Sequence, residues 1–245
     1  MKLKLIIQLY LSISIQFIME FNAVYHVFNH ANGREQLFYS YYSYNLFMQK
    51  FEEYILPVAE VYAYCLMPNH FHILLRIRPE EEVATALKVW TETKVQKRAK
   101  RLRRKTLDNK KTMSSKEFVS KSFSNFFNSY TRTSNLVFNR YGSMFIKNFK
   151  RKIVDEPSYF ARVLFYIHHN PVNHRFCTAM EKWNWSSYNA YYKKRKSFVS
   201  KDYPISFFGG LKPLIDHHKE LAEASKKVED PLDYLPSEYA FKKKF

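Results

Sequence analysis

The pair His70 and His72 is the feature of this sequence whose residue types most directly suggest chemistry. One apolar residue separates the two histidines, between the segments Met67-Pro68-Asn69 and Ile73-Leu74-Leu75. Residues i and i+2 of a β-strand point to the same face, so the two imidazoles are expected to project side by side. Two neutral imidazoles held in this way form half of a divalent-metal site. A chain with nine histidines can also contain such a pair by chance, and two structural histidines remain the alternative.

A second candidate is the pair Tyr166 and Asn170, near the end of a predicted helix. Acidic residues and a proline at Asp155-Glu156-Pro157-Ser158 are typical of a first helical turn. An apolar stripe at helical spacing follows: Tyr159, Phe160, Val163, Leu164 and Ile167. Residues four apart share a face, and Pro171, which disfavours the α region for Asn170, changes mainly ψ of that residue. The alternative is that Tyr166 packs on a sheet and Asn170 only ends the helix.

Together, the two motifs supply the parts of a phosphodiester transesterase. A tyrosine hydroxyl with a pKa of about 10 is a poor nucleophile at neutral pH. A metal held by two histidines and an amide oxygen can bind a scissile phosphate, withdraw charge from it and orient it for in-line attack. Attack would join DNA to Tyr166 through a phosphotyrosine and release a hydroxyl. Because that link keeps the bond energy, the same site could later rejoin DNA without ATP.

The elements that must position these residues indicate an α+β fold. The sequence predicts strands at 22–29, 60–67, 70–78 and 143–153, and helices at 41–55, 80–100 and 123–138, before the Tyr166 helix. This order is typical of a ferredoxin-like antiparallel sheet with helices packed on one face. The last helix would lie over the sheet and bring Tyr166 to the histidines.

The resemblance to a known family rests on five blocks that occur in the family's order between residues 23 and 192. These blocks are Tyr25-His26-Val27-Phe28-Asn29 through Phe38, Met67 through His72, Tyr141-Gly142-Ser143-Met144-Phe145, Tyr166 through Val172, and Trp185-Ser186-Ser187-Tyr188. The chain resembles the single-tyrosine HUH transposases, and most closely the REP-associated tyrosine transposases.

This resemblance implies the HUH endonuclease fold and a role for each site residue. It implies that His70 and His72 bind Mg²⁺ or Mn²⁺, that Asn170 is the third ligand, and that Tyr166 is the nucleophile. The implied substrate is single-stranded hairpin DNA. The family usually has an Arg-Gly-Asn-type turn after the first strand, where this chain has His30-Ala31-Asn32-Gly33-Arg34. The backbone of that DNA-contacting turn is therefore in question, although the catalytic set is not.

The charge of the chain fits a nucleic-acid partner. There are 40 Lys and Arg against 22 Asp and Glu, a net charge of +18 with a pI near 9.7. Half of the excess lies between Lys94 and Lys111, a segment that could equally be a solvated insertion. The expected DNA contacts are basic residues of three segments: Arg34, Lys97, Arg98, Arg101, Arg103, Arg104, Lys147, Lys150 and Arg151. Some of the 19 tyrosines could stack on unpaired bases.

We expect one catalytic domain at residues 23–192, with a basic insertion at about 94–122, between an N-terminal extension at 1–22 and a C-terminal tail at 193–245. The extension mimics a signal peptide, but it is polar, lacks a cleavage site and is too short to span a bilayer, so Met19 could be the real start. His217-His218 in the tail is interpreted as a solvated pair. Two cysteines without a CxxC motif fit a reducing bacterial cytoplasm, with the protein on nucleoid DNA and not on a membrane.

Three other interpretations stay open. The chain could be an inactive or domesticated DNA-binding protein of the same fold, a metal hydrolase of a small substrate, or a replication initiator or relaxase of the wider HUH group. A hydrolase would leave the charge of +18 unexplained. Whether the protein works as a homodimer is not decided by the sequence.

Overall fold

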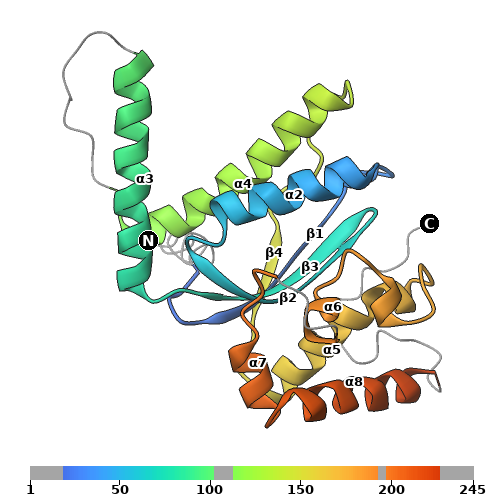
Figure 1. Ribbon diagram of the computed structural model, residues 1–245. Helices are drawn as coiled ribbons and strands as arrows, with labels where there is room; N and C mark the ends of the chain where they lie inside the picture. Colours follow the sequence, from blue (N-terminus) through green and yellow to red (C-terminus); the bar gives the residue numbers. More distant parts are fainter. Residues whose placement is uncertain (1–18, 102–112, 193–196, 227–245) are drawn as a thin grey trace, which may run out of the picture.

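The structure, a computed structural model, describes residues 19–101, 113–192 and 197–226 (Figure 1). The strands are β1 (Val24–His30), β2 (Ala59–Met67), β3 (His70–Ile77) and β4 (Lys150–Ile153). The helices are α2 (Tyr41–Tyr54), α3 (Glu80–Arg101), α4 (Ser115–Val137), α5 (Pro157–Asn173), α6 (Tyr188–Tyr192), α7 (Asp202–Phe207) and α8 (Leu211–Ser225), with a 3₁₀ turn, η1 (Met180–Lys182). None of these helices is long and apolar enough to cross a membrane.

The four strands form one antiparallel sheet in the order β2-β3-β1-β4. The crossover through α2 joins β1 to β2, and the chain returns from β3 to β4 through α3 and α4. This arrangement is the ferredoxin-like sheet that the sequence predicts. The predicted α+β fold class is confirmed.

The helices cover both faces of the sheet, which corrects one part of the prediction (Figure 1). The expectation of helices on one face holds for α2 and α4, but α5 lies on the opposite face, together with α6, α7 and α8. The reason is visible in β3, which is buried along nearly its whole length. Phe71 and Ile73 pack under α2 and α4, whereas Leu74 packs under α5. A strand with apolar residues on both faces needs cover on both sides.

Aromatic rings form the core between the sheet and the helices α2 and α4. Phe47 of α2 lies 5.3 Å from Phe71 of β3 and 4.9 Å from Phe126 of α4, measured between ring centroids. All three rings are buried. Truncation of such a ring to alanine typically costs about 3–5 kcal/mol, so this core gives the sheet a rigid base.

Two element boundaries differ from the predicted ones for identifiable reasons. Helix α4 begins at Ser115 and not near residue 123, because Ser114 and Glu117 form a reciprocal capping box. Strand β4 is shorter than the predicted strand 143–153. Asn148 has a φ of 64°, which interrupts the extended chain, and Phe145 forms only an isolated bridge with Ala31.

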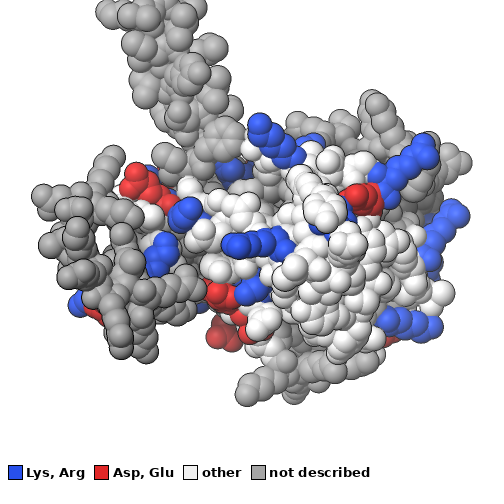
Figure 2. Space-filling model, turned by 90° about the horizontal axis from the view of Figure 1, so that it is seen from above, with Lys and Arg blue, Asp and Glu red and all other residues white. Residues whose placement is uncertain are grey.

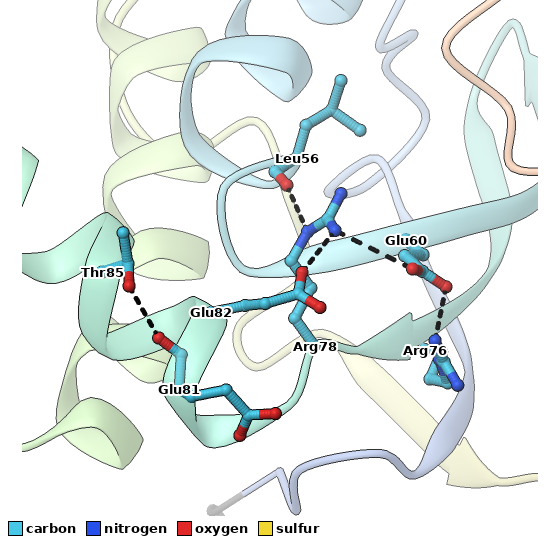
Figure 3. A network of polar contacts seen from close by, with 7 residues as sticks. All are labelled: Leu56, Glu60, Arg76, Arg78, Glu81, Glu82 and Thr85. Carbon is cyan, nitrogen blue, oxygen red and sulfur yellow. Dashed lines mark hydrogen bonds and ion pairs between the residues drawn. The ribbon is translucent and has the colours of Figure 1, made fainter.

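A polar network anchors the start of α3 to the sheet (Figure 3). The Arg78 guanidinium donates to the Leu56 carbonyl at 2.9 Å and pairs with Glu82 at 2.8 Å. Arg76 pairs with Glu60 at 2.9 Å. These two arginines are engaged in holding the end of β3, so we do not assign them to phosphate binding.

Candidate active site

Strand β3 places His70 and His72 on the face of the sheet that α5 covers. The hairpin from β2 has only Pro68 and Asn69 between its strands, so His70 is the first residue of β3. The Asn69 carbonyl accepts a hydrogen bond from the Ala31 N–H at 2.7 Å, which holds this turn against β1. The ring centroids of the two histidines are 5.2 Å apart, and both side chains are buried. The side-by-side arrangement follows from strand alternation, as the sequence predicts.

Helix α5 supplies Tyr166 and Asn170, which are both buried. Pro171 led us to expect that the chain leaves the α conformation at Asn170. Instead, the helix continues through the proline to Asn173. The proline has no N–H to donate, but the His174 N–H donates to the Asn170 carbonyl at 3.0 Å and closes the last turn. The expected change of backbone conformation at Asn170 is therefore wrong. Tyr166 and Asn170 lie on one face of the helix, as predicted.

The packing of α5 on the sheet brings the two predicted pairs together. Oδ1 of Asn170 lies 3.1 Å from Nε2 of His70. The Tyr166 and His72 rings are nearly perpendicular, with 5.1 Å between their centroids. We call His70, His72, Tyr166 and Asn170 the Tyr166 cluster. The cluster combines a phenol, two imidazoles and an amide within one buried site.

Three more histidines adjoin the cluster, and sequence reasoning assigned them no role. Nε2 of His26 in β1 lies 3.0 Å from Nδ1 of His72. The rings of His30 and His174 lie 5.8 Å and 5.0 Å from the ring of His70. The signal for two of them was present in the sequence, because His26, Phe28 and His30 alternate along β1. Strand alternation turns them to the face that carries His70 and His72.

The outer edge of the cluster is formed by His30 and His174. His30 is half-buried and His174 is exposed, whereas Tyr166 is 3% and His72 1% exposed. The site is therefore closer to solvent at His30 and His174 than at the phenol.

Burial keeps the imidazoles of the site neutral. Desolvation, together with the nearby His174 and His30, lowers the pKa of His70 to about 3, against an opposing effect of Asn170. Desolvation and the charge of Lys152 lower the pKa of His26 to about 3. The pKa of His72 is also well below its ordinary value, first through desolvation and then through the neighbouring histidines. Neutral imidazole is the form that binds metals.

Burial has the opposite effect on the phenol. Desolvation raises the pKa of Tyr166 well above its ordinary value, and the amide of Asn170 partly opposes this effect. The hydroxyl of Tyr166 is therefore protonated at neutral pH. Any nucleophilic role of this residue needs a group that stabilises the phenolate or removes its proton during the reaction.

The basic residues expected to contact DNA come from three separate parts of the chain. Arg34 and Lys147 are exposed in the segments that follow β1 and precede β4. Three of the expected residues lie in the last turns of α3: Lys97, Arg98 and Arg101. Two others lie outside the described residues: Arg103 and Arg104.

Strand β4 divides its basic residues between the two faces of the sheet. Lys150 and Lys152 pair with Phe28 and His26 of β1, so they lie on the face of the Tyr166 cluster. The Lys152 ammonium lies 4.5 Å from the centroid of the Tyr159 ring, beside the site. Arg151 points to the opposite face, where it lies over the Phe149 ring. Lys152, which was not among the expected contacts, is thus nearer the site than Arg151.

The face seen from the side of α2 and α4 carries more basic than acidic side chains (Figure 2). They are spread over this face and do not form one compact patch. Such a distribution can neutralise phosphates along an extended strand without reading its sequence.

A second buried polar network ties α5 to its surroundings. Nδ1 of His168 lies 3.0 Å from Nε2 of His218 in α8, and Nε2 of His168 lies 2.9 Å from Oγ of Ser187. His218 is fully buried, so the prediction of a solvated His217-His218 pair is wrong for this residue. Nδ1 of His218 donates to the Leu214 carbonyl at 2.9 Å. Because that carbonyl can only accept, Nε2 of His218 accepts from Nδ1 of His168, which leaves Nε2 of His168 as the acceptor that faces the Ser187 hydroxyl.

Comparison with known proteins identifies the family. A family model described as transposase, IS200 like, matches residues 19–141, about half of the chain. The chain belongs to the IS200-like transposase family. This confirms the transposase resemblance and gives the chain a transposase-like function in DNA processing. The matched span contains the two histidines of β3 and ends before α5, so it does not assign a role to Tyr166 or Asn170.

Among solved structures, the chain is similar to a REP-associated tyrosine transposase bound to a REP hairpin. The sequence identity is 12% and the TM-score is 0.46, over 76% of this chain and 92% of the other. These values are too low to transfer a feature of that protein to this chain. No curated protein matches the sequence.

Proposed function

We propose that this IS200-like transposase is a metal-dependent endonuclease and transesterase of single-stranded DNA, with Tyr166 as its nucleophile. The observation that carries this proposal is the convergence of Tyr166 and Asn170 with His70 and His72, from elements far apart in the sequence. A phenol, two neutral imidazoles and an amide oxygen are the groups that the reaction requires.

The hydrogen bonds of His70 support its assignment as a metal ligand. Its Nδ1 lies 2.8 Å from Oδ1 of Asn69, and its Nε2 lies 3.1 Å from Oδ1 of Asn170. A neutral imidazole has one N–H and can donate to only one of these oxygens. If it donates to Asn69, the lone pair of Nε2 faces the lone pairs of Asn170. A cation bound by both atoms would turn this repulsive contact into an attractive one.

The remaining donors fit the same interpretation. Nδ1 of His72 is engaged with His26, so a metal would be held through its Nε2. The bonds from Asn69 and His26 would orient the two ligand rings, as outer-shell groups do in metal sites. A set of two imidazoles, one amide oxygen and a phosphate oxygen suits Mg²⁺ or Mn²⁺. When bound, such an ion supplies positive charge to the scissile phosphate.

In the proposed reaction, the Tyr166 oxygen attacks the phosphorus of a phosphodiester. A bond forms between this oxygen and phosphorus, and the bond from phosphorus to one deoxyribose oxygen breaks. The phenol proton is finally carried by the released hydroxyl, so no other reactant is consumed. The product is a phosphotyrosine, and attack by a DNA hydroxyl reverses the step and rejoins the strand.

The substrate that we propose is a strand with a hairpin of the REP type. The burial of Tyr166, which is only 3% exposed, favours an unpaired strand, because its backbone can bend into a recessed site more easily than a duplex can. Lys150 and Lys152 lie on the same face of the sheet and would neutralise neighbouring phosphates.

The test is the formation of a covalent adduct. Purified protein is incubated with labelled single-stranded hairpin DNA and Mn²⁺, denatured, and analysed for a protein–DNA species. We expect this species to form, to require the metal, and to carry its nucleotide on Tyr166 in peptide maps. DNA binding without nicking or adduct would instead favour an inactive or domesticated DNA-binding protein. Full activity in excess chelator would refute the metal requirement.

A further inference from the structure

A cavity of about 380 Å³ lies at the edge of strand β2, outside the Tyr166 cluster. Its walls come from α2, from β2 and from the segment 184–190 that runs beside β2. Cavities that take small ligands have volumes of about 300–1,000 Å³, so one flat ring system with part of a backbone fits this space.

Aromatic side chains form one wall of the cavity. Trp185 stacks on Tyr44 with 4.3 Å between centroids and 8° between planes. Tyr41, the first residue of α2, lies 5.0 Å from Trp185 and is 73% exposed. A large ring left this exposed beside a half-buried tryptophan offers a stacking surface to an aromatic ligand.

Polar groups form another part of the lining. Asn189 is only 5% exposed, and its Nδ2 donates to the carbonyls of Glu181 and Trp183. Because both carbonyls can only accept, the remaining atom of the amide must be the oxygen. This Oδ1 has no hydrogen-bond partner among the described residues. This oxygen has an exposed surface below 1 Å², so a ligand in the cavity meets instead the other polar residues of the lining, Asn184, Ser186 and Ser197.

The backbone of the cavity wall is fixed before any ligand binds. The Leu66 N–H donates to the Trp185 carbonyl and the Ser187 N–H donates to the Tyr64 carbonyl, both at 2.9 Å. The Tyr64 N–H in turn donates to Oγ of Ser187 at 2.8 Å. Trp185 is thus held as if it belonged to an extra strand, which reduces the entropy lost on binding.

We propose that this cavity receives one unpaired base of the DNA strand that is cleaved at Tyr166. A nucleobase has a flat ring that can stack on Tyr41 beside Trp185 and polar edges that suit a lining of amide and hydroxyl groups, and unpaired bases are bound by other proteins in this way. The proposal rests on the proposed function for the presence of DNA. Ser187 in the cavity wall bonds His168, two residues after Tyr166 in α5. A base held in the cavity would therefore set the register of the strand relative to the nucleophile.

The experiment measures binding to a set of labelled hairpin strands, each with one unpaired nucleotide replaced by an abasic residue, in chelator so that no cleavage occurs. For the wild type, we expect one position at which base removal weakens binding by roughly tenfold, the effect of one lost stacking contact. Tyr41→Ala should bind the intact strand with an affinity lower by a similar factor. On the strand that is abasic at this position, the variant should bind as the wild type does. Tyr41→Phe should bind as the wild type does.

Tyr42→Ala is the matched control, because Tyr42 is the next residue of α2, is 50% exposed and does not line the cavity. It should bind every strand as the wild type does. A 2-aminopurine at the sensitive position should lose fluorescence when the wild type binds and keep it with Tyr41→Ala.

The outcomes separate this proposal from the proposed function. If the Tyr166 adduct forms but base removal has an equal effect at all positions, or Tyr41→Ala binds as the wild type does, the cavity does not bind a base. If one position depends on Tyr41 but no adduct forms, the base site stands and the proposed nucleophilic reaction is refuted.

Discussion

Nε2 of His70 lies 3.1 Å from Oδ1 of Asn170, although the two residues are 100 positions apart in the sequence. One atom belongs to the first residue of β3 and the other to the last turns of α5. A helix that shifted by one turn on the sheet would move Asn170 by about 5.4 Å and separate the pair. The distance therefore reports the position of α5, and hence of Tyr166, relative to the histidines.

This relationship predicts the effect of changing the Asn170 oxygen. Asn170→Ala removes one proposed ligand, so nicking should require a higher Mn²⁺ concentration for half-maximal activity. Asn170→Asp keeps an oxygen and adds charge, so it should need the same Mn²⁺ concentration as the wild type or a lower one. The measurement is a Mn²⁺ titration of the nicking rate on hairpin DNA. Identical Mn²⁺ requirements for the wild type and Asn170→Ala would exclude Asn170 as a ligand.

His26 is predicted to act through His72. Its Nε2 contacts Nδ1 of His72 at 3.0 Å, and a partner of this kind typically contributes a factor of about 10–100 to metal affinity. His26→Phe keeps a ring of similar size in the buried site. We expect a weaker apparent affinity for Mn²⁺ and a nicking rate at saturating Mn²⁺ that is much less affected. A variant with a lower rate but the wild-type Mn²⁺ affinity would contradict this assignment.

The parts of the site that the sequence predicted depend on local periodicity. Alternation along a strand was enough to pair His70 with His72, and helical spacing was enough to pair Tyr166 with Asn170. The contact of His26 with His72 depends on the antiparallel register of β1 and β3, in which Phe28 lies opposite His72. A single sequence does not show which residues of two strands pair, so it does not specify that register. The alternation of His26, Phe28 and His30 could still have indicated that both histidines share one face of the strand.

The second layer of helices was missed for a related reason. The sequence was interpreted as a sheet with one covered face, yet the run His70-Phe71-His72-Ile73-Leu74-Leu75 offers apolar residues to both faces. His218 was interpreted as one of a solvated pair because it lies in a polar helix of the tail. It lies four residues after the buried Leu214, within the stripe of α8 that packs toward α5. Because His218 lies in the apolar stripe of this helix, its position in the sequence could have indicated that it is buried.

The burial of His218 predicts a pH dependence of stability. Desolvation lowers the pKa of this imidazole from 6.5 to about 3 in the folded protein. Between these values the unfolded chain binds a proton that the folded protein does not bind, so stability falls as the pH is lowered from about 6.5 towards 3. One such group contributes a slope of at most about 1.4 kcal/mol per pH unit.

His218→Gln tests this dependence, because glutamine can keep both hydrogen bonds and does not titrate. Urea unfolding at several pH values between about 5 and 8 should show a smaller loss of stability at low pH for the variant. Equal slopes for both proteins would mean that His218 is not the group responsible.

The basic segment between Lys94 and Lys111 is predicted to bind phosphates without regard to sequence. Neutralising its ten Lys and Arg residues should weaken binding to all single strands alike and reduce the dependence of affinity on salt. A comparison variant neutralises three lysines in and just after α8, and shows how much affinity is lost when charges elsewhere on the surface are removed: Lys212, Lys219 and Lys226. An unchanged affinity and salt slope after neutralisation of the segment would identify it as a solvated insertion.

The last prediction concerns the identity of the nucleophile. Tyr166→Phe removes only the oxygen and keeps the ring against His72, so the variant should fold and bind hairpin DNA as the wild type does. It should form neither a nick nor an adduct, because no neighbouring hydroxyl among the described residues is placed to replace it. Tyr159 lies on the same face of α5, but seven residues earlier, about 10 Å along the helix axis. Tyr159→Phe is therefore the matched control and should still give an adduct on Tyr166. A Tyr166→Phe variant that cleaves DNA, or an adduct mapped to Tyr159, would show that the site uses another nucleophile.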